Sequence, residues 1–218
     1  MREIKGVLFD MDGVLVDNMH MHIEAFKQFC EQFGVEDIEQ KMYECAGMGN
    51  DEIMRIMLPA EVVESRGTDS LSAEKEAKYR EIYADSIEPV KGLVEMLKLL
   101  NERGIKCAVG SSGCRENVEF VLNSCGIAHY FSALVYSDLV TRCKPDPEIY
   151  LTAASLLGLK PEECLVFEDA LMGIESARAA KVAKVVGLTT TIDRQMLEDS
   201  GGCDYIVDDF TQIIEEFR

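Results

Sequence analysis

Short apolar runs alternate with longer stretches of helical spacing along most of this chain. Apolar runs bounded by turn residues are typical of buried strands. We expect six strands, at Ile4–Phe9, Ile105–Gly110, Ala133–Tyr136, Cys164–Phe167, Ala183–Gly187 and Asp204–Val207. Between them, apolar residues recur every three or four positions around Leu93–Leu100, Val118–Cys125, Ile149–Leu157 and Ile174–Ala180. The first three of these stretches end at a glycine, the usual helix stop. Strands that alternate with helices predict an α/β fold with a Rossmann-like parallel sheet.

One long segment departs from this alternation. From Asn18 to about Ser86 no run is typical of a strand, whereas three parts have helical spacing. These parts are His22–Phe33, Glu52–Leu58 and Glu74–Ala84. We expect Arg66–Ser70 to form a loop and Ser72 to cap the helix that follows. The pattern predicts an all-helical cap domain, residues 17–87, inserted into a core domain formed by residues 1–16 and 88–218.

Composition and charge narrow the classes of function. The chain has 218 residues, 47% of them hydrophobic, and a formal net charge of −18, which argues against nucleic acid and anionic membrane surfaces as partners. No apolar run approaches the length of a membrane span, and the N-terminus lacks the pattern of a signal peptide. The eight cysteines form no C-x-x-C pair, so we expect reduced thiols in a cytoplasmic protein. We also expect a monomer.

The first strand ends at two carboxylates one residue apart, Asp10 and Asp12, and Gly13 follows at once. Open α/β sheets bind ligands at the carboxyl ends of their strands. Two neighbouring carboxylates repel each other unless a cation lies between them or one holds a proton, and Mg²⁺ prefers such oxygen ligands. If the chain had only the Asp-x-Asp motif, a plain turn would explain it. A calcium loop would not, because its template requires Gly and Glu where this chain has Leu15 and Met21.

Three later loops also carry polar groups after a strand. Ser111 and Ser112 follow the second strand and suit a phosphate, although such a loop is also a common helix cap. Lys144 follows the third strand, in Lys144–Pro147, where Asp146 and Pro147 favour a helix start. Glu168 and Asp169 follow the fourth strand. Because parallel strands end at one edge, these groups and the first two aspartates predict a phosphoryl-transfer site.

With these motifs in this order, the chain closely resembles the haloacid dehalogenase superfamily. Within it, the chain is similar to the subgroup that contains beta-phosphoglucomutase and sugar-phosphate phosphatases. The family's four motifs correspond to Asp10–Gly13, Ser111, Lys144–Pro145 and Glu168–Asp169. The resemblance spans essentially the whole chain, including the helical insertion after the first motif.

The resemblance implies a role for each motif residue. Asp10 would attack phosphorus and form an aspartyl-phosphate, and Asp12 would protonate the leaving oxygen and later activate water. Ser111 and Lys144 would bind the phosphoryl group. Asp10, Asp169 and the backbone carbonyl of Asp12 would ligate Mg²⁺, with Glu168 in or near its coordination shell. The dehalogenase branch lacks the second aspartate, so Asp12 favours phosphate chemistry.

The insertion carries the question of substrate specificity. Lys75 and Tyr79 match a patch of the mutase cap, and His22 aligns with a histidine near the mutase hinge, although it could equally be a partly buried helix residue. With Ser112 and Asn50, we regard Lys75 and His22 as candidate substrate-binding residues.

The chain departs from the mutase at the contacts for a second phosphate. The mutase holds that phosphate with an arginine and a Ser-Lys pair, and this chain has Asn50, Gly113 and Cys114 there. Lost charge-assisted bonds typically cost roughly 1.5–3 kcal/mol each. Arg115 or Arg142 could take their place.

The sequence therefore predicts a Mg²⁺-dependent phosphatase that acts on a small phosphorylated metabolite such as a sugar phosphate. A beta-phosphoglucomutase-like phosphotransferase is the alternative. A non-catalytic binding protein is the third hypothesis, and the presence of all four motifs counts against it.

Overall fold

Residues 4–218, which the computed structural model describes, contain a six-stranded sheet in which every pair of neighbouring strands is parallel. The strands are β1 (Gly6–Phe9), β2 (Lys106–Gly110), β3 (Phe131–Val135), β4 (Cys164–Glu168), β5 (Lys184–Leu188) and β6 (Tyr205–Val207). Their order is β3-β2-β1-β4-β5-β6, so β1 lies in the centre between β2 and β4. All six predicted strands are present, and the prediction of an α/β fold is confirmed.

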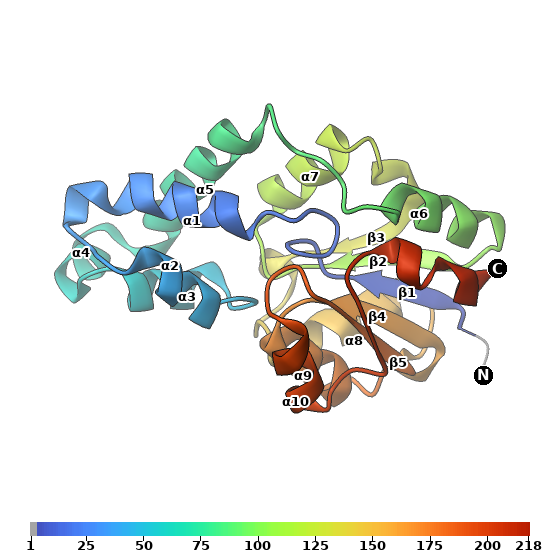
Figure 1. The fold of residues 1–218 in the computed structure, drawn as a ribbon. Helices are drawn as coiled ribbons and strands as arrows, with labels where there is room; N and C mark the ends of the chain where they lie inside the picture. Colours follow the sequence, from blue (N-terminus) through green and yellow to red (C-terminus); the bar gives the residue numbers. More distant parts are fainter. Residues whose placement is uncertain (1–3) are drawn as a thin grey trace.

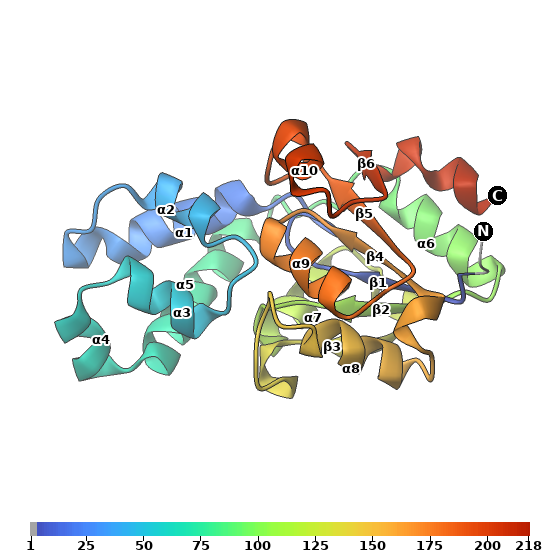
Figure 2. The ribbon, with the colours of Figure 1, turned by 90° about the horizontal axis from the view of Figure 1, so that it is seen from below.

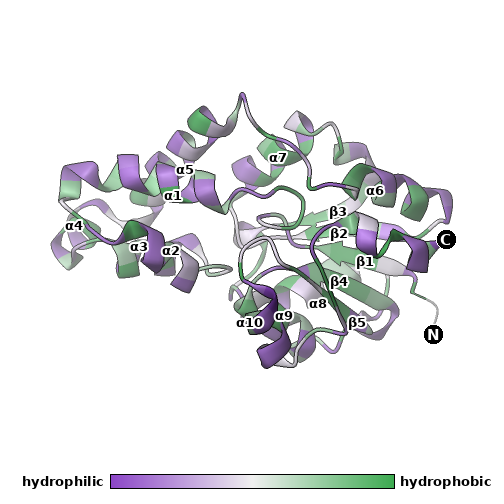
Figure 3. Ribbon diagram, viewed as in Figure 1, coloured by the Kyte–Doolittle hydropathy of each residue, from purple (hydrophilic) through white to green (hydrophobic). Residues whose placement is uncertain are grey.

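Helices cover both faces of the sheet, as Figures 1 and 2 show. The helices are α6 (Leu93–Glu102), α7 (Arg115–Ser124), α8 (Glu148–Leu156), α9 (Leu171–Ala179) and α10 (Arg194–Ser200). Val7 and Phe9 of β1 belong to the hydrophobic cluster with α6 and α7, whereas Leu8 belongs to the cluster with α8 and α9. Successive strand residues point to opposite faces, so a strand buried on both sides is apolar throughout. Figure 3 shows the strands as the most hydrophobic part of the fold.

Among the described residues of this core, α10 is the one α-helix that the sequence pattern did not predict. It has seven residues, and only Leu197 is buried. One buried residue does not produce the repeating apolar stripe from which an amphipathic helix is recognised.

The segment between β1 and α6 contains only helices among its regular elements. They are α1 (Met19–Cys30), α2 (Ile38–Glu44), α3 (Asn50–Met57), α4 (Ala60–Arg66), α5 (Thr68–Tyr83) and the short 3₁₀ helix Glu31–Phe33. They pack around a hydrophobic cluster of their own that includes Phe26, Met54 and Leu71. In Figure 1 this helical insertion lies to the left of the sheet.

The predicted loop at Arg66–Ser70 is wrong. Arg66 ends α4 and Thr68 begins α5, so Gly67 alone separates the two helices, with a φ of 76°. Thr68 and Leu71 are buried on the first turn of α5, and Ser72 lies inside this helix instead of capping it. The polar and glycine-containing sequence predicted a longer break, but a single residue with positive φ is enough to turn the chain. The short helices α2 and α4 were also missed.

The chain leaves the core and returns to it at one place. Val16 forms an isolated bridge with Pro89, and the N–H of Val90 donates to the carbonyl of Leu15 at 2.9 Å. On this basis we propose residues 17–87 as the inserted domain, and residues 1–16 and 88–218 as the core. Residues 1–3 of this core lie outside the described part of the chain.

None of the described helices is long and apolar enough to cross a membrane. All eight cysteines lie within residues 4–218, and each is a free thiol.

Candidate active site

Buried charged groups from separate parts of the chain meet at the carboxyl edge of the sheet. Asp10 follows β1, Glu168 ends β4, and Lys144 lies between β3 and α8. The Lys144 Nζ is 2.6 Å from Asp10 Oδ1 and 2.5 Å from Glu168 Oε1. Since β1 and β4 are neighbours, their ends converge as the parallel sheet predicts.

Asp10, Glu168 and Asp169 form a group that could hold a metal ion. Each is buried, and one carboxylate oxygen from each lies within 4.8 Å of the others. Burial raises the pKa of Asp10 to about 7; Glu168 and Asp12 act in the same direction, and Lys144 opposes them. Burial, Glu168 and Asp10 hold the pKa of Asp169 well above its usual range. One ammonium cannot balance three carboxylates, so this site favours a divalent cation with oxygen ligands.

Glu168 is held by several donors of the protein itself. Its Oε1 accepts hydrogen bonds from Lys144 and from the Tyr150 hydroxyl at 2.6 Å. Its Oε2 accepts from the backbone N–H groups of Asp169 at 3.0 Å and Ala170 at 3.3 Å. Because its oxygens already have these partners, Glu168 anchors Lys144 beside Asp10.

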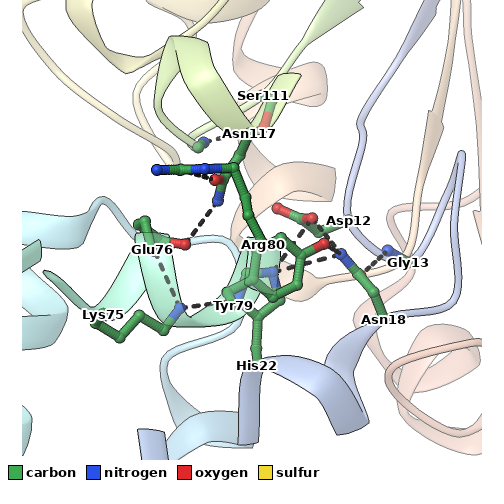
Figure 4. A network of polar contacts seen from close by, with 11 residues as sticks. Asp12, Gly13, Asn18, His22, Lys75, Glu76, Tyr79, Arg80, Ser111 and Asn117 are labelled. Atoms are coloured by element: carbon green, nitrogen blue, oxygen red, sulfur yellow. Dashed lines mark hydrogen bonds and ion pairs between the residues drawn. The ribbon is translucent and has the colours of Figure 1, made fainter. Parts of the chain in front are cut away.

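Asp12 has different neighbours from Asp10. Its Oδ1 accepts a hydrogen bond from Asn18 Nδ2 at 2.6 Å and lies 3.4 Å from His22 Nε2, as Figure 4 shows. Desolvation would raise the pKa of Asp12, but His22 and the hydrogen bonds from His22 and Asn18 lower it below its ordinary value. The Asp12 side chain lies outside the three-carboxylate group described above.

His22 connects Asp12 with Lys75 of α5. The Lys75 Nζ is 2.8 Å from His22 Nδ1, and an ammonium can only donate, so Nδ1 accepts and the ring proton is on Nε2, toward Asp12. The His22 ring also stacks on Tyr79, with the centroids 4.0 Å apart. His22 is thus buried in its helix and also lines the cavity described below, while its role in substrate binding stays a prediction.

The serines after β2 contact backbone groups. The Ser111 Oγ accepts from the N–H of Gly113 at 3.0 Å, and the Ser112 Oγ donates to the carbonyl of Gly47 in the helical insertion at 2.9 Å. Both serines are buried. Ser112 thus forms a direct hydrogen bond between the edge of the sheet and the insertion.

A cavity of about 80 Å³ lies between the core and the insertion. Asp10, Asp12, Ser111, Ser112, Lys144 and Asp169 line it from the core side. His22, Asn50, Lys75 and Met48 line it from the insertion. The structure therefore brings the predicted site residues to one cavity, with the exception of Glu168, which lies behind Lys144.

Arg115 and Arg142 do not join this group. Arg115 pairs with Glu119 on the exposed side of α7, and Arg142 pairs with Asp146. Neither arginine lines the cavity. The suggestion that one of them replaces the missing contacts to a second phosphate is not supported by their positions.

Several residues of the site were not singled out from the sequence. Asn18 bonds Asp12, Tyr150 bonds Glu168, and Glu76 and Asn117 extend the network around Lys75. Asn117 is a buried polar residue beside the apolar Val118 and Val121 of α7, and this contrast is the signal that could have marked it. Glu76 lies on α5 among buried residues that include the polar Thr68 and Lys75, so no such contrast marks it.

A model of the haloacid dehalogenase-like hydrolase family matches residues 7–187. The chain belongs to this family. This haloacid dehalogenase-like hydrolase is 30% identical over 205 residues to a phosphorylated carbohydrates phosphatase of Thermotoga maritima, covering 91% of this chain and 92% of that one. It is 28% identical over 183 residues to the beta-phosphoglucomutase of Bacillus subtilis, covering 81% and 80% of the two chains. The predicted superfamily and subgroup are thereby confirmed.

Solved structures agree with this assignment. A hydrolase from Pseudomonas syringae has a TM-score of 0.86 at 25% identity, over 97% of each chain. One plant relative is much longer: it matches at 32% identity over 206 residues, and the chain spans 19% of its length.

Proposed function

We propose that this hydrolase is a Mg²⁺-dependent phosphatase that acts on a small phosphorylated metabolite such as a sugar phosphate. The observation that carries the proposal is the pair of aspartates in one cavity. Asp10 lies with Lys144 and Asp169, and Asp12 lies with Asn18 and His22. A nucleophile and a separate proton donor are what two-step phosphoester hydrolysis requires.

In the proposed first step, a carboxylate oxygen of Asp10 attacks the phosphorus atom. The bond between phosphorus and the ester oxygen breaks, and Asp12 gives a proton to that leaving oxygen. In the second step Asp12 takes a proton from water, whose oxygen attacks the phosphorus. The aspartyl-phosphate bond breaks, inorganic phosphate leaves, and both aspartates return to their starting states.

Lys144 and Ser111 would hold the phosphoryl group during both steps. The Lys144 ammonium is fixed between Asp10 and Glu168, so its position is set before substrate arrives. Asp10, Asp169 and the backbone carbonyl of Asp12 would hold Mg²⁺, with Glu168 in or near its shell. The ion would supply positive charge to the phosphoryl oxygens. We propose the helical insertion as the cap that limits access to this site.

Because the chain is similar both to a phosphatase and to a beta-phosphoglucomutase, hydrolysis and phosphoryl transfer are the two candidate reactions. Hydrolysis is favoured because Asn50 and Gly113 line the cavity where the mutase resemblance calls for charged or hydroxyl contacts. We also propose a cytoplasmic monomer without nucleic-acid or membrane partners, which the net charge of −18 and the free thiols support.

Phosphate release from a panel of phosphorylated metabolites, with Mg²⁺ and with EDTA, tests the proposal. We expect Mg²⁺-dependent release that Asp10→Asn abolishes, because an amide cannot serve as the nucleophile. Asp17→Asn is the matched control, since Asp17 is an exposed carboxylate seven residues along the chain. Turnover by the Asp10→Asn variant, or no release by the wild type on any substrate, would overturn the proposal.

A further inference from the structure

We propose that Glu76 restricts this enzyme to phosphate monoesters whose leaving group carries no second anionic group. The inference rests on the function proposed above and adds the class of substrate. It concerns the wall of the cavity formed by the helical insertion, opposite the three carboxylates.

Lys75 and Glu76 form an ion pair within this wall. The Lys75 Nζ is 3.0 Å from Glu76 Oε1, and the two side chains are buried, with residue exposures of 2% and 4%. Both residues line the cavity. Alone, the Lys75 ammonium would attract an anionic group on the substrate. With Glu76 beside it, the pair carries no net charge.

A residue of the core holds the Glu76 carboxylate in place. Asn117 of α7 donates to Glu76 Oε2 at 2.6 Å, and Arg80 of α5 donates to Asn117 Oδ1 at 2.6 Å, as Figure 4 shows. Each Glu76 oxygen therefore has a donor. Although burial raises the pKa of Glu76, the Lys75 ammonium and the hydrogen bond from Asn117 help to lower it below its ordinary value. The carboxylate stays charged and cannot easily turn away from Lys75.

Among the described residues, the rest of the cavity lining offers no unpaired cationic side chain to a second anionic group of the substrate. Within residues 4–218, the cationic side chains that line it are Lys75 and Lys144. Lys144 is paired with Asp10 and Glu168. His22 accepts a hydrogen bond from Lys75, which a doubly protonated ring could not do.

A substrate's second anionic group would therefore lie near Asp12 and Glu76 without compensation. Like charges placed together in a partly buried site repel each other and weaken binding. A hydroxylated leaving group meets a suitable partner instead, because Asn50 also lines the cavity, whereas the amides of Asn18 and Asn117 already bond Asp12 and Glu76. Amides can both donate to and accept from hydroxyl groups. The wall thus favours neutral polyol phosphates over bisphosphates.

Matched substrate pairs test this inference. We would measure kcat/KM for glucose 1-phosphate against glucose 1,6-bisphosphate, and for fructose 1-phosphate against fructose 1,6-bisphosphate, with p-nitrophenyl phosphate as the common reference. We expect the wild type to prefer the monophosphates by at least about tenfold, and Glu76→Gln to reduce that preference by about tenfold, because the Lys75 charge is then unbalanced. Glutamine retains an oxygen for Asn117.

Glu81→Gln is the matched control. Glu81 lies on the same helix and pairs with Lys78, but its side chain is 70% exposed, so we expect the wild-type preference. A general loss of structure in Glu76→Gln would lower kcat/KM for both members of a pair and would not change their ratio.

The outcomes separate the two proposals. If the wild type hydrolyses p-nitrophenyl phosphate but treats monophosphates and bisphosphates alike, the inference is wrong and the phosphatase proposal stands. The same follows if folded Glu76→Gln keeps the wild-type ratio. If no phosphoester is hydrolysed, both proposals are overturned. Should Glu76→Gln not fold, the wild-type ratio still decides.

Discussion

Asp10 and Asp12 are one residue apart, yet their carboxyl groups experience opposite electrostatic effects. Burial and the neighbouring carboxylates raise the pKa of Asp10 to about 7, whereas the hydrogen bonds of Asn18 and His22 help to keep that of Asp12 low. Both aspartates follow the end of β1, outside the regular alternation of the strand, and each meets its own set of neighbours. The proposed roles require an ionised Asp10 and a protonated Asp12, which a divalent cation beside Asp10 and an anionic phosphoryl group beside Asp12 would favour.

At the residue scale, Asp12→Asn tests the proposed proton donor. An amide cannot protonate the leaving oxygen, and loss of a general acid typically slows turnover by about 10²–10⁴-fold. We expect that loss for sugar phosphates, and a smaller effect on the first step with p-nitrophenyl phosphate, whose leaving oxygen needs no proton. Steady-state and burst kinetics measure both. Equal losses of the first step on the two substrates would contradict the proposed role of Asp12.

At the scale of secondary-structure elements, two glycines make room for the carboxylates. A Cβ on Gly13 would lie 1.8 Å from Asp169 Oδ2, and Gly13 has a φ of 75° that disfavours any other residue. A Cβ on Gly173 of α9 would lie 1.7 Å from Glu168 Oε1. The loop after β1 and the helix after β4 therefore approach the site closely only because these positions have no side chain.

Gly173→Ala is the prediction at this scale. Glycine to alanine inside a helix usually stabilises it, by about 0.5–1 kcal/mol. Here the methyl group would displace Glu168, and overpacking of this kind typically costs about 1–3 kcal/mol. We expect a lower free energy of unfolding and loss of most of the activity, measured by chemical denaturation and phosphate release. Glu175→Ala, at an exposed position of α9, is the control. A variant more stable than the wild type would disprove the argument.

At the scale of the whole molecule, core and insertion meet through a few specific contacts. Ser112 donates to Gly47, and Asn117 of the core donates to Glu76 of the insertion. A Cβ on Gly49 would lie 2.8 Å from Cys143 Sγ, so the insertion also approaches the loop that carries Lys144. The cavity depends on both parts of the chain.

Stabilisation of the molecule by Mg²⁺ should increase with pH. Without metal, the folded-state pKa of Asp10 of about 7 exceeds its ordinary value of 3.8, so the folded state holds a proton that the unfolded state releases. The contribution of Asp10 to stability is therefore present below about pH 4 and is lost as the pH rises to about 7. Mg²⁺ binds the ionised carboxylates and competes with protons.

We expect the increase in Tm on adding Mg²⁺ to be larger at about pH 8 than at about pH 5.5. Thermal unfolding with Mg²⁺ or EDTA at each pH measures it. Asp169→Asn should remove most of the increase at both values, while Asp138→Asn, between β3 and α8, should preserve it. A Tm increase that is independent of pH would show that Mg²⁺ does not bind these carboxylates.

The six strands, most of the helices and the family could be predicted from the sequence, because continuous apolar runs, helical spacing and ordered motifs are local properties. The placement of Asp10, Asp12, Ser111, Lys144 and Asp169 at one edge followed from the parallel sheet. The break at Gly67 and the helices α2, α4 and α10 could not be predicted from the sequence. Short helices with few buried residues have no repeating apolar stripe.

The sequence by itself therefore determined which side chains occur at the ends of the strands and in which order. Only the tertiary structure decided their partners: that Glu168 holds Lys144, that His22 lies between Asp12 and Lys75, and that Asn117 fixes Glu76. These contacts join residues up to 53 positions apart within the network around Lys75. Their geometry depends on how the insertion packs on the core, and no local pattern contains that information.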